Sequence, residues 1–218
     1  MVAWSWDKAV ELYDWVHERG LQKPETVDLD LVFLPGQTPH NQMSSLRPSA
    51  RMHAPIGFAA EDSNASGFPG FSVWRNILVN ELNVCESRIV PIKGVFIRKN
   101  TAGQLVAHTG DDMRAFVIHA KEHSLRDVAS LQPDLHTLRC FMTAVRWVQQ
   151  LGAKNLRIHP LIGDDLSWDE YALHSQGKQS GRRVDMVFYE AAKLHPLWER
   201  EQIASPHECF EYIERMGL

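Results

Sequence analysis

Residues 127–158, DVASLQPDLHTLRCFMTAVRWVQQLGAKNLRI, contain the pattern that decides the fold class. The apolar run over 127–131 predicts a buried strand, and the apolar spacing over 135–151 predicts a helix that ends at Gly152. The segment 156–158 predicts a second strand. Because a helix that joins two neighbouring strands makes a right-handed parallel crossover, this unit predicts an α/β protein with a parallel sheet.

The sequence before this unit shows the same alternation of helices and strands. Residues 5–18 predict an amphipathic helix that begins after Ser5 and ends at Gly20. Its buried face is expected to carry Trp6, Val10, Tyr13 and His17. The apolar run that stops at Pro35-Gly36 predicts the first strand of the sheet. Residues 37–70 are polar and predict a long loop of the functional or mobile kind, interrupted by a weak strand at 56–60.

Further elements follow on both sides of the central unit. Residues 72–82 predict a helix capped by Ser72, and 88–92 predict a strand. The segment 95–107 predicts a hairpin insertion with its turn at 100–103, and a helix is expected over 110–123. Beyond Pro160, residues 161–180 are polar. Helices are predicted over 182–195 and 206–216, the latter with Ser205 as N-cap and Pro206 in its first turn.

These elements predict a single α/β domain over residues 1–218. We expect a three-layer, Rossmann-like architecture in which a mostly parallel sheet carries helices on both faces. The core of the domain is expected at about 29–162, with the β-hairpin insertion at 95–107 and a C-terminal helical extension at 181–218.

Composition excludes several classes of protein. The chain has 218 residues, with 23 Lys and Arg against 27 Asp and Glu, so the net charge of −4 argues against nucleic-acid binding. The three cysteines, Cys85, Cys140 and Cys209, lack the spacing of a disulfide framework or a zinc site, and the histidines show no metal-binding spacing. No signal peptide or membrane-spanning run is evident. We therefore expect a cytoplasmic protein with free thiols, no bound metal and no membrane contact.

The loops that follow the first two strands are candidates for ligand binding. In an open parallel sheet, ligands bind beyond the carboxyl ends of the strands. Glycine-containing loops let backbone amides approach an anion, and a hydroxyl at a helix start adds a further donor. The predicted cradle consists of Gly36, Gln37, Ser66, Gly67 and Ser72. The same segments are also compatible with two ordinary turns, because neither matches a P-loop or a GxGxxG sequence.

Two further segments carry candidate chemical groups. Thr109, Asp111 and Asp112 begin a helix, where they could cap it or, alternatively, place an acid in the crevice. His136 and Arg139 lie three residues apart at the start of the helix predicted over 135–151, which follows the strand at 127–131. Both side chains therefore fall on one face of that helix. Such a pair can hold an anion while the imidazole exchanges a proton near neutral pH. An ordinary exposed helix surface is the alternative explanation.

The order of these motifs resembles the bacterial family of uncharacterised domains typified by YdcF, SanA and ElyC. Residues 66–68 stand where that family has SGG, and 72–74 stand where it has SEA. Residues 108–112 resemble its N-T-x-E-N segment, and 136–139 resemble its H-x-x-R. The likeness covers about residues 29–162, with departures at Phe68 and Val73. It implies a role in envelope physiology or the binding of an adenosyl cofactor such as S-adenosylmethionine.

Together these patterns lead to a hypothesis about function. The crevice is expected to bind a small anionic or nucleotide-like molecule, with His136 as acid/base, Asp111 orienting a hydroxyl or water, and Arg139 supplying charge. Thr109 and Asp112 would complete the ligand-binding set. Transfer or hydrolysis on a phosphorylated or carboxylated substrate is the natural reaction class. A non-catalytic ligand sensor or scaffold and an S-adenosylmethionine-binding enzyme remain alternatives, and the sequence leaves the oligomeric state open.

Overall fold

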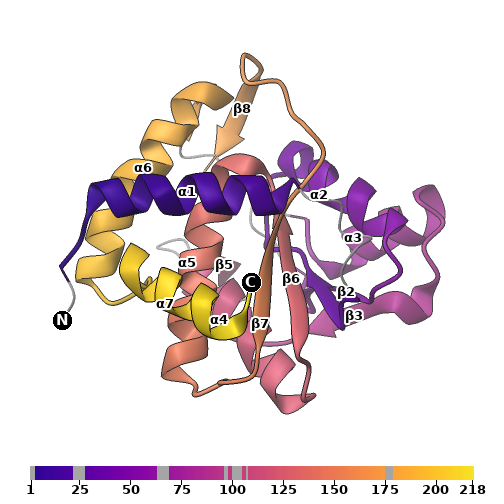
Figure 1. Ribbon diagram of the computed structural model, residues 1–218. Helices are drawn as coiled ribbons and strands as arrows, with labels where there is room; N and C mark the ends of the chain where they lie inside the picture. Colours follow the sequence, from indigo (N-terminus) through magenta and orange to yellow (C-terminus); the bar gives the residue numbers. More distant parts are fainter. Residues whose placement is uncertain are drawn as a thin grey trace.

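A parallel sheet at the centre of the computed structural model organises the protein (Figure 1). The structure describes residues 3–21, 28–62, 69–95, 98–99, 105–106, 108–174 and 179–218. Five strands pair in the order β3-β2-β1-β6-β7, and every pair is parallel. Their bounds are β1 (Leu31–Phe33), β2 (Ile56–Ala59), β3 (Ile89–Ile92), β6 (Asp127–Gln132) and β7 (Arg157–Ile162). The predicted Rossmann-like α/β class is thereby confirmed.

Helices cover both faces of this sheet. The bounds of the α-helices are α1 (Trp6–Gly20), α2 (Pro39–Arg51), α3 (Phe71–Asn76), α4 (Thr109–Glu122), α5 (Asp134–Gln150), α6 (Arg183–Glu199) and α7 (Pro206–Met216). A π-helical turn, η2 (Ile77–Glu81), continues α3, and a 3₁₀ turn, η3 (Glu86–Arg88), precedes β3. In Figure 1, α2 and α3 lie to one side of the sheet, and α1, α5 and α7 lie to the other.

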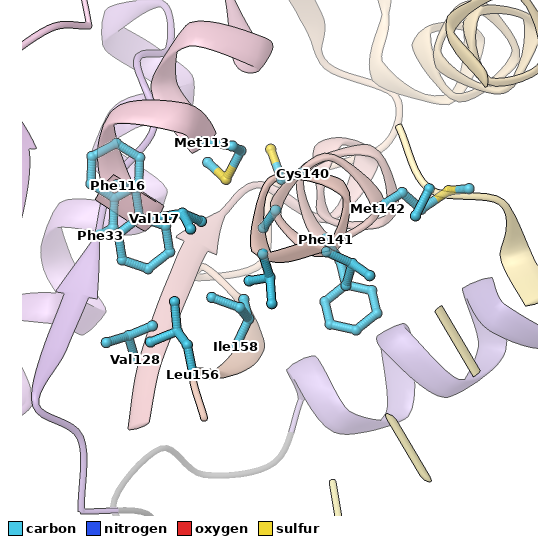
Figure 2. Close-up of a cluster of buried hydrophobic side chains, with 14 of the residues drawn as sticks. Phe33, Met113, Phe116, Val117, Val128, Cys140, Phe141, Met142, Leu156 and Ile158 are labelled. Atoms are coloured by element: carbon cyan, nitrogen blue, oxygen red, sulfur yellow. The ribbon is translucent and has the colours of Figure 1, made fainter. Parts of the chain in front are cut away.

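The alternation of side chains along the strands builds two hydrophobic layers. In β1, Leu31 and Phe33 join a cluster with residues of α1, α4, α5 and α7, whereas Val32 joins a cluster with residues of α2 and η2. Figure 2 shows part of the first cluster, where Phe33 stacks on Phe116 of α4 with ring centroids 4.7 Å apart. Successive strand residues point to opposite faces, so a strand buried on both sides holds the three layers together.

Helix α2 corrects the prediction of a long loop over 37–70. The helix begins at Pro39, immediately after its N-cap Thr38, and five of its seven buried residues are polar. The seven are Asn41, Gln42, Ser44, Ser45, Leu46, Pro48 and Ser49. Because a polar buried face carries no hydrophobic periodicity, and because Pro48 lies inside the helix, the sequence pattern does not indicate a helix here. The first strand and the weak second strand on either side of it are confirmed.

The buried face of α1 also differs from the prediction. Ser5 is the N-cap and accepts a hydrogen bond from the Lys8 amide, as expected. The buried residues, however, are Ala9, Leu12, Val16 and Gly20. Trp6 and Val10 are 51% and 59% exposed. Small residues on the inner face let α1 approach the sheet: a Cβ on Gly20 would lie 2.6 Å from Cγ1 of Ile162.

Two hairpins extend beyond the central sheet. Strands β4 (Arg98–Lys99) and β5 (Leu105–Val106) pair antiparallel, which confirms the hairpin excursion; its predicted turn at 100–103 lies outside the described residues. A second antiparallel pair, β8 (Tyr171–His174) and β9 (Gln179–Arg182), leads into α6. It was not predicted, because residues 161–180 are polar and lack a clear strand alternation.

The outer edge of β7 is covered by α7. The predicted N-cap Ser205 begins α7, and it also forms a capping box with Glu208, in which each side chain bonds the other's backbone amide. From this helix the Tyr212 hydroxyl accepts a hydrogen bond from the Ile158 amide at 2.7 Å and donates to the Leu156 carbonyl at 2.8 Å. No helix in the described part of the chain has both the length and the apolar character needed to cross a bilayer.

The loop after β7 touches the backbone of α2 at Gly163, which makes this glycine a test of the packing. A Cβ on Gly163 would lie 2.5 Å from the Ser44 carbonyl oxygen, so Gly163→Ala should lower the free energy of unfolding by about 1–3 kcal/mol. Gly110 of α4 has no atom within 4 Å of such a Cβ, and Gly110→Ala should be neutral or stabilise by up to about 1 kcal/mol. Denaturant unfolding measures both changes; equal effects would contradict this packing.

Candidate functional site

The order of the strands reverses between β1 and β6, and open parallel sheets generally bind ligands beyond the carboxyl ends of the strands at such a point. The loop 34–38 follows β1, and the first turn of α5 follows β6. Five of the predicted site residues meet near this point through the contacts described below. They are Gly36, Thr109, Asp112, His136 and Arg139.

Asp112 lies in the first turn of α4 and faces the loop after β1. The backbone amide of Gly36 donates a hydrogen bond to its carboxylate, and the residue is only 3% exposed. Burial raises the pKa of Asp112 from 3.8 to about 8; the Gly36 hydrogen bond opposes this rise, and the nearby charge of Asp111 adds to it. Its Oδ1 atom has no hydrogen-bond partner within the described residues. Asp112 is therefore a protonated, buried acid at neutral pH.

His136 and Arg139 lie on one face of α5, as predicted, and are tied to two other helices. Arg139 donates to the Thr109 hydroxyl of α4 at 2.6 Å and to Nδ1 of His136 at 3.0 Å. It also forms an ion pair with the Glu190 carboxylate of α6. Glu190 in turn lies 3.4 Å from Nδ1 of His136 and 2.6 Å from the Lys193 ammonium. These contacts join α4, α5 and α6 in one polar network.

The network determines the protonation states of its members. Burial lowers the pKa of Arg139, but the adjacent Glu190 carboxylate outweighs this and holds the pKa above its usual value. Since a charged guanidinium donates to Nδ1 of His136, a neutral imidazole carries its proton on Nε2. The Glu190 carboxylate neutralises the Arg139 charge. Arg139 thus fixes the positions of Thr109, His136 and Glu190, and less of its charge is available to a ligand than the sequence alone suggested.

The remaining predicted site residues have different surroundings. Gln37 is buried, and its backbone amide donates to the Gln42 side chain at 2.9 Å. Asp111 is 2% exposed and lies beside Asp112. Ser72 is exposed, and its hydroxyl donates to the Asp62 carboxylate at 2.6 Å. Ser66 and Gly67 lie outside the described residues.

Two capping predictions were wrong. The N-cap of α3 is Gly70 rather than Ser72, because Asp62 takes both the hydroxyl and the backbone amide of Ser72. The N-cap of α4 is His108, and Thr109 is the first helical residue, with its hydroxyl accepting from Arg139. The loops after β1 and β2 nevertheless face each other, as expected: Gly36 and Gly70 line a cavity of about 20 Å³, room for about one water molecule.

Sequence reasoning missed Glu190, which is 4% exposed and central to the network. A signal for it exists in the sequence: Met186, Glu190 and Leu194 recur at i, i+4 and i+8 on the buried face of α6. A carboxylate in the middle of such a face requires a buried cationic partner. Within the described ranges, no group of three or more His, Cys, Asp or Glu side chains is arranged to hold a metal ion.

No protein-family model matches this chain, and no curated protein sequence matches it.

The ion pair between Arg139 and Glu190 is expected to behave as a buried pair. Arg139→Met leaves a buried carboxylate without its main partner and should lower the free energy of unfolding by about 3–5 kcal/mol. Arg139→Met with Glu190→Leu removes both charges and should be more stable than the single variant. Denaturant unfolding compares the two. As a control, Arg75→Met in the exposed pair with Glu86 should cost under about 1 kcal/mol; a similarly small loss at Arg139 would contradict the assignment.

Asp112 should make stability depend on pH. Its pKa is raised in the folded state, so the unfolded chain releases the proton at lower pH, and stability is lost as pH rises from about 4 to about 8. Asp112→Asn removes this loss. The variant should be more stable than the parent at pH 8.5, on the order of a few kcal/mol, with little difference at pH 4. Urea unfolding from pH 4 to pH 8.5 measures the free energy of unfolding of both proteins. If that free energy changed with pH in the same way in both, Asp112 would not be protonated in the folded state.

Proposed function

We propose that the crevice between β1 and β6 binds a small anionic or nucleotide-like ligand, and that Asp112 and His136 act there as an acid/base pair. The observation that carries the proposal is the position of Asp112. It is a buried acid that accepts a hydrogen bond from the amide of Gly36, in the loop that leads from β1 to the N-terminus of α2, and burial raises its pKa to about 8.

The N-terminus of α2 supports an anionic ligand. Thr38 is the N-cap, but its side chain makes no capping hydrogen bond; it donates instead to the Leu173 carbonyl of β8 at 3.3 Å. Pro39 has no N–H, so the uncapped amides of the first turn belong to His40 and Asn41. An uncapped first turn combines free N–H donors with the positive end of the helix dipole, which favours phosphate or carboxylate.

The neighbouring groups support acid/base chemistry. A carboxyl group that is protonated near neutral pH can donate its proton to a leaving group. His136 lies in the same network, where its Nδ1 accepts a hydrogen bond from Arg139. Hydrolysis or transfer on a phosphorylated or carboxylated substrate is the reaction class that uses these groups. Among the two neighbouring acids, we assign this role to Asp112 because of its contact with Gly36, with Asp111 orienting a hydroxyl or water.

The resemblance to the YdcF, SanA and ElyC family fits the same site. Membership in that family, an adenosyl cofactor such as S-adenosylmethionine and a cytoplasmic location are part of the proposal. A non-catalytic sensor is the second candidate function, favoured by the extent to which Glu190 already neutralises Arg139.

A carboxylate placed at the helix N-cap tests the ligand site. Thr38→Asp should cap α2 itself and repel an anion, whereas Thr38→Ser keeps a hydroxyl. Orthophosphate, adenosine 5′-monophosphate and S-adenosylmethionine are titrated in thermal unfolding. A ligand at about 100 times its dissociation constant should raise Tm of the parent and of Thr38→Ser by about 5–10 °C. Thr38→Asp should lose most of this shift.

The outcomes separate the two candidate functions. No shift with any of the three compounds, or equal shifts in Thr38→Asp and the parent, would reject the α2 site. With binding established, hydrolysis of p-nitrophenyl phosphate and methyl transfer from S-adenosylmethionine are assayed in the parent and in Asp112→Asn. An activity that falls about 10²–10⁴-fold in the variant supports the acid role. Binding without activity supports the sensor.

A further inference from the structure

A second cavity lies between α1 and the loops that follow β6 and β7. Its volume is about 390 Å³, at the small end of the range for pockets that bind small molecules. Its lining includes the segments 133–135 and 162–166, together with residues of α1 and the first residue of α6. None of Gly36, Thr109, Asp112, His136 or Arg139 belongs to this lining, so the cavity is distinct from the site described above.

Most of the cavity wall is apolar or aromatic. Tyr13 of α1 and Leu21, the residue after α1, line the cavity together with Leu135, Ile162 and Trp168. Such a wall accommodates the hydrocarbon or aromatic part of a ligand, while a few polar groups determine its orientation.

Arg183 is the polar group that indicates the ligand class. It is 1% exposed, and its Nη1 donates to the Ser167 carbonyl at 2.8 Å and to the Glu170 carboxylate at 2.7 Å. Its Nε and Nη2 atoms are buried and have no acceptor among the described residues. A buried donor without an acceptor is costly, typically by about 1–3 kcal/mol. Arg183 lines the cavity, so a ligand bound there can supply the missing acceptor.

His17 supplies a second polar contact. Its Nδ1 lies 3.2 Å from Oδ1 of Asp134, and its ring stacks on Tyr13 with centroids 5.8 Å apart. Both contacts fix the ring, whereas Nε2 makes no hydrogen bond to any described residue. With both ring nitrogens protonated, the imidazole donates from Nδ1 to Asp134 and has Nε2 left to donate to a carboxylate.

The acidic side chains of the cavity wall repel an anion, but most of them are paired with a basic side chain. Asp134 is paired with His17, and Asp164 is paired with Arg51 at 2.6 Å. Asp165 is exposed at the cavity edge. Thus Nε and Nη2 of Arg183 lack an acceptor among the described residues, whereas two of the three carboxylates have a partner. This asymmetry favours a ligand that brings an acceptor.

We propose that this cavity is a second binding site that takes a small carboxylic acid with an apolar or aromatic body, its carboxylate bound by Arg183 and His17. The body of the ligand packs against the aromatic and aliphatic wall defined above.

A matched pair of probes tests the charge requirement. 3-Phenylpropionate and 3-phenylpropylamine share the same body and differ in the sign of their charge. Hexanoate serves as an aliphatic carboxylate. Calorimetric titration of the full chain should show binding of at least one carboxylate, at least tenfold tighter than that of the amine. Equal or tighter binding of the amine, or no binding of either carboxylate, would overturn the proposal.

Three variants locate the binding. Arg183→Gln should weaken carboxylate binding at least tenfold. Arg182→Gln is the matched control, because Arg182 is exposed, pairs with Asp185 and does not line the cavity. It should bind within twofold of the parent. Leu21 is 60% exposed on the cavity lining, so Leu21→Trp should block entry while leaving Arg183 intact.

The variant Leu21→Trp still tests the site if Arg183→Gln does not fold. Loss of binding in Leu21→Trp supports the site; binding equal to the parent in Leu21→Trp overturns it. Asp112→Asn should bind the carboxylate as the parent does, since Asp112 belongs to the other site. This result separates the present proposal from the function proposed for the crevice.

Discussion

The central strand β1 must be buried on both faces, and the arrangement of the rest of the chain follows from this constraint. All three of its residues are buried, with Leu31 and Phe33 on one face and Val32 on the other. Burying both faces requires a helical layer on each side. Because β1 stands between β2 and β6, its loop also lies where the strand order reverses. The same constraint therefore produces both the core and the crevice.

A second dependence links the crevice to the C-terminal part of the chain. Arg139 of α5 is buried with Glu190 of α6, and neither charge is tolerated there alone. The ion pair also holds Thr109 and His136, so α6 completes a site whose other residues come from the central unit. The expected core at 29–162 contains the strands, but the site extends beyond it.

The sequence predicted the layers better than it predicted the site. Strands and most helices have hydrophobic periodicity, which is a local property, and the parallel order follows from their alternation. Helix α2 escaped detection because most of its buried residues are polar. The buried face of α1 was misassigned because Ala9, Leu12, Val16 and Gly20 pack inward, rather than Trp6 and Val10. The pairing of His136 with Arg139 was predicted from helical spacing. Their contact with Glu190 forms only when α6 packs against α5, and no local sequence pattern encodes that packing.

The hydrogen bonds from Tyr212 of α7 to the edge strand β7 affect how the chain behaves among its own copies. An uncovered parallel edge offers a row of amide and carbonyl groups to which another polypeptide can add a strand. The Tyr212 hydroxyl occupies one donor and one acceptor of that row, at Ile158 and Leu156. One phenol group thus blocks β-sheet extension from molecule to molecule at this point, and it does so with a side chain that also fills the core.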